Sequence, residues 1–199
     1  MTNLLIFDTE TTGLPRDKTM PANLAAGNWP DLVSLSWKVY TDGVCTSTNS
    51  YLILPQGWEI PQEATKIHGI SHEKACSDGV RLSTALDAFC KDVATCSVIM
   101  AHNLSFDKQV ILNALRWRLF RKWVNWCPLA DICTGILSTN ELKLSFSGRN
   151  YGSYKMPSLK ELYKATFQKD DPPGAHESLR DVEVLEEIVR SRWPRFFGE

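Results

Sequence analysis

The sequence lacks a run of apolar residues long enough to span a membrane, and its first ten residues, MTNLLIFDTE, reach an acid after a very short apolar run. We therefore expect no signal peptide, no membrane partner and an intracellular location, cytoplasmic or nuclear. The chain also lacks an excess of charge of one sign, because its net charge is -1 and its pI is near 6.4. Such a chain has no overall basic field of the kind many duplex-binding proteins carry, although a local basic groove is compatible with it.

Cysteine motifs are missing as well. No two of the six cysteines form Cys-x-x-Cys, and no histidine pair lies nearby at zinc-finger spacing. We expect reduced, mostly buried thiols. The remaining composition, 43% hydrophobic and 23% charged, is that of an ordinary globular protein, and 199 residues suit one domain spanning 1–199.

Strands are predicted first along the chain. LLIF at 4–7 has the character of a central strand buried on both faces, and a long surface loop rich in Pro, Gly and Asn follows at 15–31. Residues 32–40 alternate, with Val33, Leu35, Trp37 and Val39 on one side. TDG at 41–43 then has hairpin-turn chemistry and leads into a returning strand at 44–55.

Helices dominate after Pro55. The pattern predicts helices between Pro61 and Gly69 and within 82–95, 106–123, 158–167 and 177–193, with short strands at 97–102 and 127–131. The second of these helices carries Leu82, Leu86, Phe89 and Val93 on one face. A block of strands followed by alternating helices and strands predicts an α/β protein with a mixed sheet and helices on its faces.

Acidic residues stand at three places in this pattern. Asp8 and Glu10 leave the end of the first strand on one face, where two carboxylates repel each other unless a cation lies between them. Asp107 stands at the start of a helix, and His176 and Asp181 near the start of the last one. Each place has an ordinary explanation, namely a turn, a helix cap and a solvated loop histidine, although Asp181 is unusual beside buried apolar neighbours.

Together these residues make four carboxylates and one imidazole. Oxygen ligands suit Mg²⁺ or Mn²⁺, and a pair of such ions can stabilise the attacking and leaving oxygens of a displacement at phosphorus. The imidazole can take a proton from water at neutral pH. The combination therefore indicates a metal-dependent displacement at phosphorus in which water is activated.

The segments FDTETTGL (7–14), AHNLSFD (101–107) and HESLRD (176–181) resemble the three motifs of the DEDD exonuclease superfamily. They are most similar to the histidine-containing, DnaQ-like (DEDDh) branch, which includes the proofreading subunit of bacterial replicative polymerase. IPQEATKIHGIS at 60–71 resembles a further segment of that branch. The sister branch has a tyrosine four residues before its last aspartate, a spacing this sequence lacks. The resemblance runs from about residue 3 to about residue 190 and implies a ribonuclease H-like fold, with a five-stranded mixed sheet flanked by helices on both faces.

The resemblance also implies roles. Asp8, Glu10, Asp107 and Asp181 would hold two Mg²⁺ or Mn²⁺ ions, and His176 would be the general base. The implied reaction is 3′–5′ exonucleolysis that releases nucleoside 5′-monophosphates, with single-stranded DNA or frayed DNA ends as the favoured substrate. Two alternatives stay open: an exoribonuclease of the oligoribonuclease kind, and a non-catalytic module that binds nucleic-acid 3′ ends.

Substrate contacts are implied less directly, and each has a structural alternative. Leu14 would wedge against the terminal base, or is a turn residue, with Thr11 and the backbone to Gly13 beside the last nucleotide. His68 would lie near the terminal sugar and phosphate, or caps a helix. Phe106 would touch the substrate, or belongs to the core, and Asn103 would orient the loop that carries Asp107, or caps the helix.

Two features are particular to this chain. Segment 115–126, LRWRLFRKWVNW, interleaves arginines and a lysine with three tryptophans. Cations beside stacking surfaces suit single-stranded nucleic acid, but we favour an ordinary amphipathic helix with a solvated basic face. The 15–31 loop would shape the substrate mouth or a partner surface.

Asp131 has the character of a structural residue.

Overall fold

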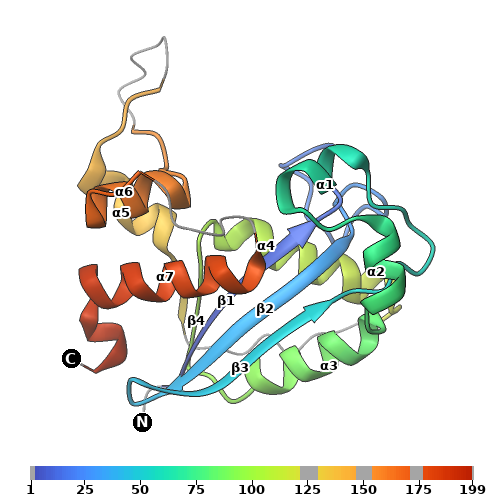
Figure 1. Cartoon of the computed structure of the whole chain (residues 1–199), viewed down its shortest axis with the longest axis horizontal. Helices are drawn as coiled ribbons and strands as arrows, with labels where there is room; N and C mark the ends of the chain where they lie inside the picture. Colours follow the sequence, from blue (N-terminus) through green and yellow to red (C-terminus); the bar gives the residue numbers. More distant parts are fainter. Residues whose placement is uncertain (1–2, 122–129, 147–153, 171–176, 199) are drawn as a thin grey trace.

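The computed structural model of the chain describes residues 3–121, 130–146, 154–170 and 177–198 (Figure 1). The strands in chain order are β1 Asn3–Thr11, β2 Leu32–Thr41, β3 Val44–Leu52, β4 Val98–Ala101 and β5 Ala130–Cys133. The α-helices are α1 Gln62–His68, α2 His72–Asp78, α3 Leu82–Val93, α4 Leu104–Asn113, α5 Thr134–Leu142, α6 Leu159–Phe167 and α7 Ser178–Arg192. A π-helix, η1 Ala114–Arg118, continues α4, and a 3₁₀ helix, η2 Pro194–Phe197, follows α7.

The five strands form one mixed sheet in the order β3-β2-β1-β4-β5. The pairs β1–β2 and β2–β3 are antiparallel, whereas β1–β4 and β4–β5 are parallel. The turn predicted at 41–43 is present, with positive φ at both Asp42 (47°) and Gly43 (81°) as a two-residue hairpin turn requires. The prediction of an α/β fold with a five-stranded mixed sheet is therefore confirmed, and β1 lies at the centre of that sheet.

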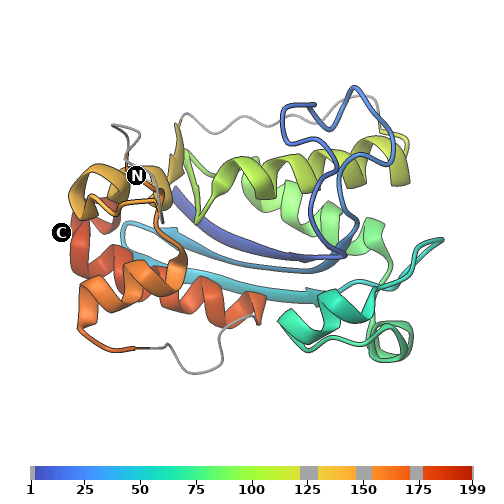
Figure 2. The same cartoon turned by 90° about the horizontal axis from the view of Figure 1, so that it is seen from above.

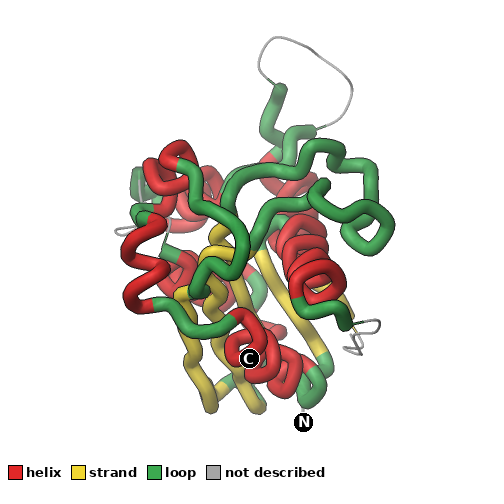
Figure 3. The backbone as a smooth tube through the Cα atoms, turned by 90° about the vertical axis from the view of Figure 1, so that its right-hand side faces the viewer, coloured by secondary structure: helices red, strands yellow, loops and turns green. Residues whose placement is uncertain are grey.

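Helices cover both faces of the sheet. Leu5 and Phe7 of β1 pack with the α3 and α4 side of the core, whereas Leu4 and Ile6 pack with the α6 and α7 side. Figure 2 shows α3 and α4 (green) on one side of the sheet and α6 and α7 (orange and red) on the other, and Figure 3 shows the strands between two sets of helices. The even-numbered side chains of β1 therefore face α7, and the odd-numbered ones face α4.

Local signals account for several helix boundaries. The left-handed residue Gly69 (φ 74°) ends α1, as predicted. The α6 helix begins with a capping box, in which the Ser158 side chain accepts from the Glu161 backbone N–H and the Glu161 side chain accepts from the Ser158 backbone. Four side chains predicted on one face of α3 are all buried: Leu82, Leu86, Phe89 and Val93.

The structure differs from the predicted elements in four places. The helix predicted over 106–123 is α-helical from Leu104 to Asn113 and continues as the π-helix η1 to Arg118; residues 122–123 lie outside the described residues. Helices α2 and α5 were not predicted. The last strand is β5 at Ala130–Cys133, shifted from the predicted 127–131, of which 127–129 lie outside the described residues.

The cysteine prediction was partly wrong. The five cysteines that the structure describes have free thiols, but of these only Cys96 is buried, while Cys45 and Cys76 are exposed. Cys127 lies outside the described residues. Within the described ranges, no helix has the length and apolar character needed to cross a membrane.

Candidate active site

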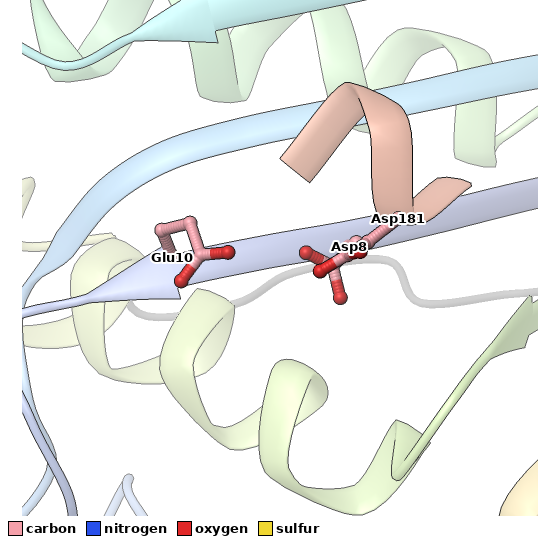
Figure 4. Close-up of side chains that lie close together, drawn as sticks. All are labelled: Asp8, Glu10 and Asp181. Carbon is pink, nitrogen blue, oxygen red and sulfur yellow. The ribbon is translucent and has the colours of Figure 1, made fainter. Parts of the chain in front are cut away.

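Three of the predicted acids lie close together where β1 packs against the first turn of α7. Asp8 and Glu10 continue the even-numbered row of β1 that begins with Leu4 and Ile6, so they face α7. Asp181 lies in the first turn of that helix. One carboxylate oxygen from each of these residues lies within 4.8 Å of those of the other two, and the three side chains converge in Figure 4.

Small hydroxyl side chains let α7 approach the sheet at this point. Ser36 is the register partner of Asp8 on β2, and Ser34 is the partner of Glu10. The Ser178 hydroxyl, at the start of α7, lies 2.7 Å from that of Ser36 and 3.0 Å from that of Ser34, and all three serines are buried. These hydrogen bonds hold the first turn of α7, and with it Asp181, against the strand that pairs with β1.

Asp107 reaches the site from the other face of the sheet. It lies in the first turn of α4, its residue exposure is 3%, and it lies outside the group of three carboxylates that converge. Thr9 points toward α4 because it belongs to the odd-numbered row of β1, and its hydroxyl donates to Asp107 Oδ1 at 2.7 Å. Thr9 therefore joins the fourth predicted carboxylate to the strand that carries Asp8 and Glu10.

Burial and mutual repulsion make these acids hard to ionise. Burial, together with the charges of Asp107, Glu10 and Asp181, raises the pKa of Asp8 well above its usual range. Burial and then the charges of Asp181 and Asp107 raise the pKa of Glu10 to about 8. Burial also raises the pKa of Asp107 to about 7, although the hydrogen bond from Thr9 lowers it. The site therefore concentrates negative charge that a cation would stabilise.

The donor set fits a hard divalent cation. Carboxylate oxygens are the ligands that Mg²⁺ and Mn²⁺ prefer, and such ions keep coordination positions for water or substrate phosphate. Among the described residues, no cationic side chain contributes to the pKa shift of Asp8 or Glu10. Asp8, Glu10 and Asp181 could hold such an ion, with Asp107 beside them.

A hollow of about 390 Å³ continues from this face of the sheet toward α1. Its lining includes Ser34, Ser178 and His68, and Ser34 is the register partner of Glu10. His68 is the last residue of α1, has 5% exposure, and its Nδ1 accepts from the Ile70 N–H at 3.1 Å. His68 therefore lines the same hollow as Ser34 and Ser178, and its ring also has a role at the end of α1.

The segment after Glu10 turns toward solvent. Thr11 is buried and its hydroxyl donates to the Gly13 carbonyl at 2.8 Å, whereas Leu14 is 72% exposed. A large apolar side chain held in solvent directly beyond two acids is available to a ligand. The predicted base His176 lies outside the described residues.

Three further residues from the sequence analysis have different surroundings, namely Phe106, Asn103 and Asp131. Phe106 packs against the core, with its ring centroid 5.8 Å from that of Trp29, so its structural alternative has support. Asn103 occupies the N-cap position of α4 in the left-handed conformation (φ 67°), and its carbonyl accepts from the Phe106 N–H, but its exposed side chain makes no cap hydrogen bond. Asp131 forms an ion pair with Lys108, in agreement with a structural role.

Two contributors to the site escaped sequence reasoning. Thr9 stands between the two acids of the first motif, so its side chain points to the opposite face of the strand. A helix carrying Asp107 on that face would have predicted a contact between Thr9 and Asp107. Ser178 gave a weaker signal, because a serine at a helix start is common for capping alone. Its hydrogen bonds to β2 depend on tertiary packing.

Residues 5–189 match the sequence model of the exonuclease family RNase_T. No curated protein matches the chain. Among solved structures, Escherichia coli exonuclease I in its zinc-bound complex with single-stranded DNA is 19% identical, with a TM-score of 0.70 over 100% of this chain and 42% of that one. Exonuclease I from Methylocaldum szegediense is 20% identical, with a TM-score of 0.68 and 100% and 42% coverage.

Exonuclease X in complex with 5′-overhanging duplex DNA is 23% identical, with a TM-score of 0.57 over 95% of this chain and 92% of that one. At these identities the similarity establishes the shared fold. The chain spans less than half the length of the exonuclease I proteins, whereas its length is close to that of exonuclease X.

Proposed function

Because the chain belongs to the exonuclease family RNase_T, a group of DnaQ-like DEDD enzymes, we propose that it hydrolyses nucleic-acid strands from the 3′ end and releases nucleoside 5′-monophosphates. The observation that supports this most strongly is the convergence of Asp8, Glu10 and Asp181 under the first turn of α7. Carboxylates that converge on one partly buried face repel each other, and a cation between them relieves that repulsion.

The proposed mechanism depends on divalent cations. Two Mg²⁺ or Mn²⁺ ions, when bound, supply positive charge beside the scissile phosphate. Asp8, Glu10, Asp107 and Asp181 would hold them. Asp8 and Glu10 project from the central strand, which pairs with β2 along its whole length and with β4 as far as Ile6, so the ligands stand on an ordered element of the sheet.

The chain's own groups position the reactants. We assign His176 as the general base that takes a proton from the attacking water, since an imidazole has the required pKa range. The hollow lined by His68, Ser34 and Ser178 has room for the terminal sugar and phosphate. The exposed Leu14 side chain, with Thr11 and the turn between them, would lie against the terminal base.

DNA is the favoured substrate in this proposal. Exonuclease I and exonuclease X have been crystallised with DNA, and we propose that this chain likewise acts on single-stranded or frayed DNA ends. An exoribonuclease of the oligoribonuclease kind is the alternative substrate assignment. We also propose that residues 1–199 work as a single exonuclease domain.

Nucleotide release from 5′-labelled DNA and RNA oligonucleotides, single- and double-stranded, tests the proposal. We expect stepwise shortening from the 3′ end with Mg²⁺ or Mn²⁺, none with chelator, and a loss of at least about a hundredfold in Asp8→Asn. Asp131→Asn, which alters an acid outside the site, is the matched control and should keep the wild-type rate.

Two results would contradict the proposal. Hydrolysis that continues in chelator or in Asp8→Asn would show that the acid cluster does not carry the activity. Failure of the wild-type protein to shorten any of the substrates, while it still binds them, would favour a non-catalytic binding module. Faster hydrolysis of short RNA than of DNA would assign the substrate to the oligoribonuclease class.

A further inference from the structure

A second cleft lies directly beyond the acids. Its volume is about 660 Å³, within the roughly 300 to 1,000 Å³ of typical ligand clefts. It is bounded by the turn that follows β1, by the end of the 15–31 loop and by η1 with the residues after it. Figure 2 shows this loop (blue) beside the C-terminal end of α4. The cleft therefore begins at Leu14, the residue proposed to contact the terminal base.

The walls of this cleft are held by specific bonds. The Trp117 indole N–H donates to the Ala22 carbonyl at 2.6 Å. Arg118 donates to both carboxylate oxygens of Asp31, at 2.6 and 2.7 Å, in the paired geometry that suits guanidinium and carboxylate. The Asn113 amide donates to the Pro30 carbonyl at 3.2 Å. The loop is thus fastened to α4 and η1 at Ala22, Pro30 and Asp31, and these bonds fix two walls of the cleft.

These bonds change the interpretation of the Trp/Arg segment. In the part of it that the structure describes, residues 115–121, Trp117 and Arg118 face the loop and join it to the helix, so they do not form the solvated basic face that we favoured. Both residues lie in the π-helix η1. Turns of this kind inside α-helices are frequent at functional sites.

The lining combines an aromatic ring, an apolar side chain and a positive charge. Leu14 is 72% exposed and Phe120 is 78% exposed, and both line the cleft. Arg16 lines it as well, and in the described part of the chain no carboxylate forms an ion pair with Arg16. An exposed aromatic ring and a guanidinium that line the same cleft suit a base and a phosphate of one strand.

Phe120 is held outward at an energetic cost. Its φ is 54°, in the left-handed region that bulky residues rarely adopt. Phe120 is the second residue after η1, and Leu119 lies between them. Bulky residues in this strained backbone conformation are concentrated at ligand-binding positions. Glycine or asparagine would adopt the same conformation at a lower energetic cost.

We propose that this cleft binds the nucleotides that precede the 3′-terminal one, with the Phe120 ring stacked on a base and the Arg16 guanidinium facing the phosphodiester backbone. The inference rests on the proposed exonuclease function and adds an upstream subsite to it. The occupant is a single strand, because its bases must be unpaired to stack on a side chain. Leu14 separates the two subsites.

Substrate length provides the test. A mononucleotide ester, the p-nitrophenyl ester of thymidine 5′-monophosphate, occupies the acid site alone, whereas an eight-nucleotide strand would also reach the cleft. For Phe120→Ala and Arg16→Ala we expect kcat/KM on the eight-nucleotide DNA to fall roughly tenfold or more, with the value on the ester unchanged. Phe120→Gly, which relieves the strain and removes the ring, should give the same loss.

Matched controls come from outside the cleft. Lys18→Ala removes an exposed charge from the same loop, and Ile136→Ala removes an exposed apolar side chain from α5; both should keep wild-type values on both substrates. Equal effects of Phe120→Ala on the ester and on the strand, or no effect on either, would overturn the inference.

Binding without turnover separates this inference from the proposed activity. In chelator, a fluorescently labelled eight-nucleotide DNA or RNA should bind Phe120→Ala and Arg16→Ala roughly tenfold more weakly than the wild type, as measured by anisotropy. This loss would support the cleft even if the wild-type protein released no nucleotide. Unchanged affinity in both variants would reject the cleft while leaving the exonuclease proposal in place, and comparison of the DNA and RNA arms identifies the strand that the cleft prefers.

Discussion

Replacing Glu10 with glutamine should stabilise the metal-free protein. In the folded chain, burial and then the charges of Asp181 and Asp107 raise the pKa of Glu10 from 4.5 to about 8. A carboxyl group with a raised pKa binds its proton more tightly in the folded state than in the unfolded state. The folded state therefore loses stability as the pH rises from about 4.5 to about 8, and glutamine, which never ionises, avoids that loss.

The size of the effect follows from the shift. Each pKa unit corresponds to about 1.4 kcal/mol, so ionising Glu10 costs the folded protein at most about 4 kcal/mol at pH 8 and under about 1 kcal/mol at pH 5. Because the side chain is half-buried, solvent screens part of this cost, and we expect a gain of about 2 to 4 kcal/mol at pH 8. In a chain of this length that gain raises Tm by about 2 to 4 °C per kcal/mol.

Urea unfolding in chelator, followed by tryptophan fluorescence at pH 5 and pH 8, measures this gain. Glu59→Gln, at an exposed position, is the control and should change stability little at either pH. Adding Mn²⁺ at pH 8 should stabilise the wild type and have a much smaller effect on Glu10→Gln, which has lost a ligand. Equal stability of Glu10→Gln and wild type at pH 8, or the same gain at both pH values, would refute the argument that the cluster needs a cation.

Two further substitutions test how the site and its surroundings are held. Thr9→Val keeps the shape of the side chain but removes the hydroxyl that donates to Asp107. We expect the metal concentration for half-maximal activity to rise about 10- to 100-fold, with a loss of unfolding free energy of about 1 to 3 kcal/mol from the unsatisfied carboxylate and with Thr48→Val as the control. An unaltered metal requirement would exclude this role. Arg118→Gln removes the ion pair that fastens the 15–31 loop, so trypsin should cut this loop faster in timed digests analysed by mass spectrometry, and an unchanged cleavage rate would show that the ion pair does not hold the loop.

The parts of the structure that could be predicted from the sequence depend on short-range regularities. The two-residue period of β1 places Leu4 and Ile6 on the face of Asp8 and Glu10, and the 3.6-residue period of α3 places its apolar residues on one face. Both patterns are local, so they are visible without the fold. The three acidic motifs could likewise be assigned to the end of a strand and to the first turns of two helices.

Other features depend on contacts between distant segments. Trp117 and Arg118 have the sequence signature of a basic helical face, but their partners, Ala22 and Asp31, lie in a loop far away in the sequence. No local pattern shows that the helix widens there or that this loop packs against it. Helices α2 and α5 are short and carry few apolar residues, so their periodicity is weak, and they form because neighbouring elements pack against them.

The central position of β1 and the late position of α7 have a consequence for synthesis of the protein. Asp181 leaves the ribosome 171 residues after Glu10, so the cluster is incomplete while the chain between them is made. On the proposed function, a nascent chain that stays close to messenger RNA cannot digest it. The nuclease would become competent when its last helix docks on the sheet.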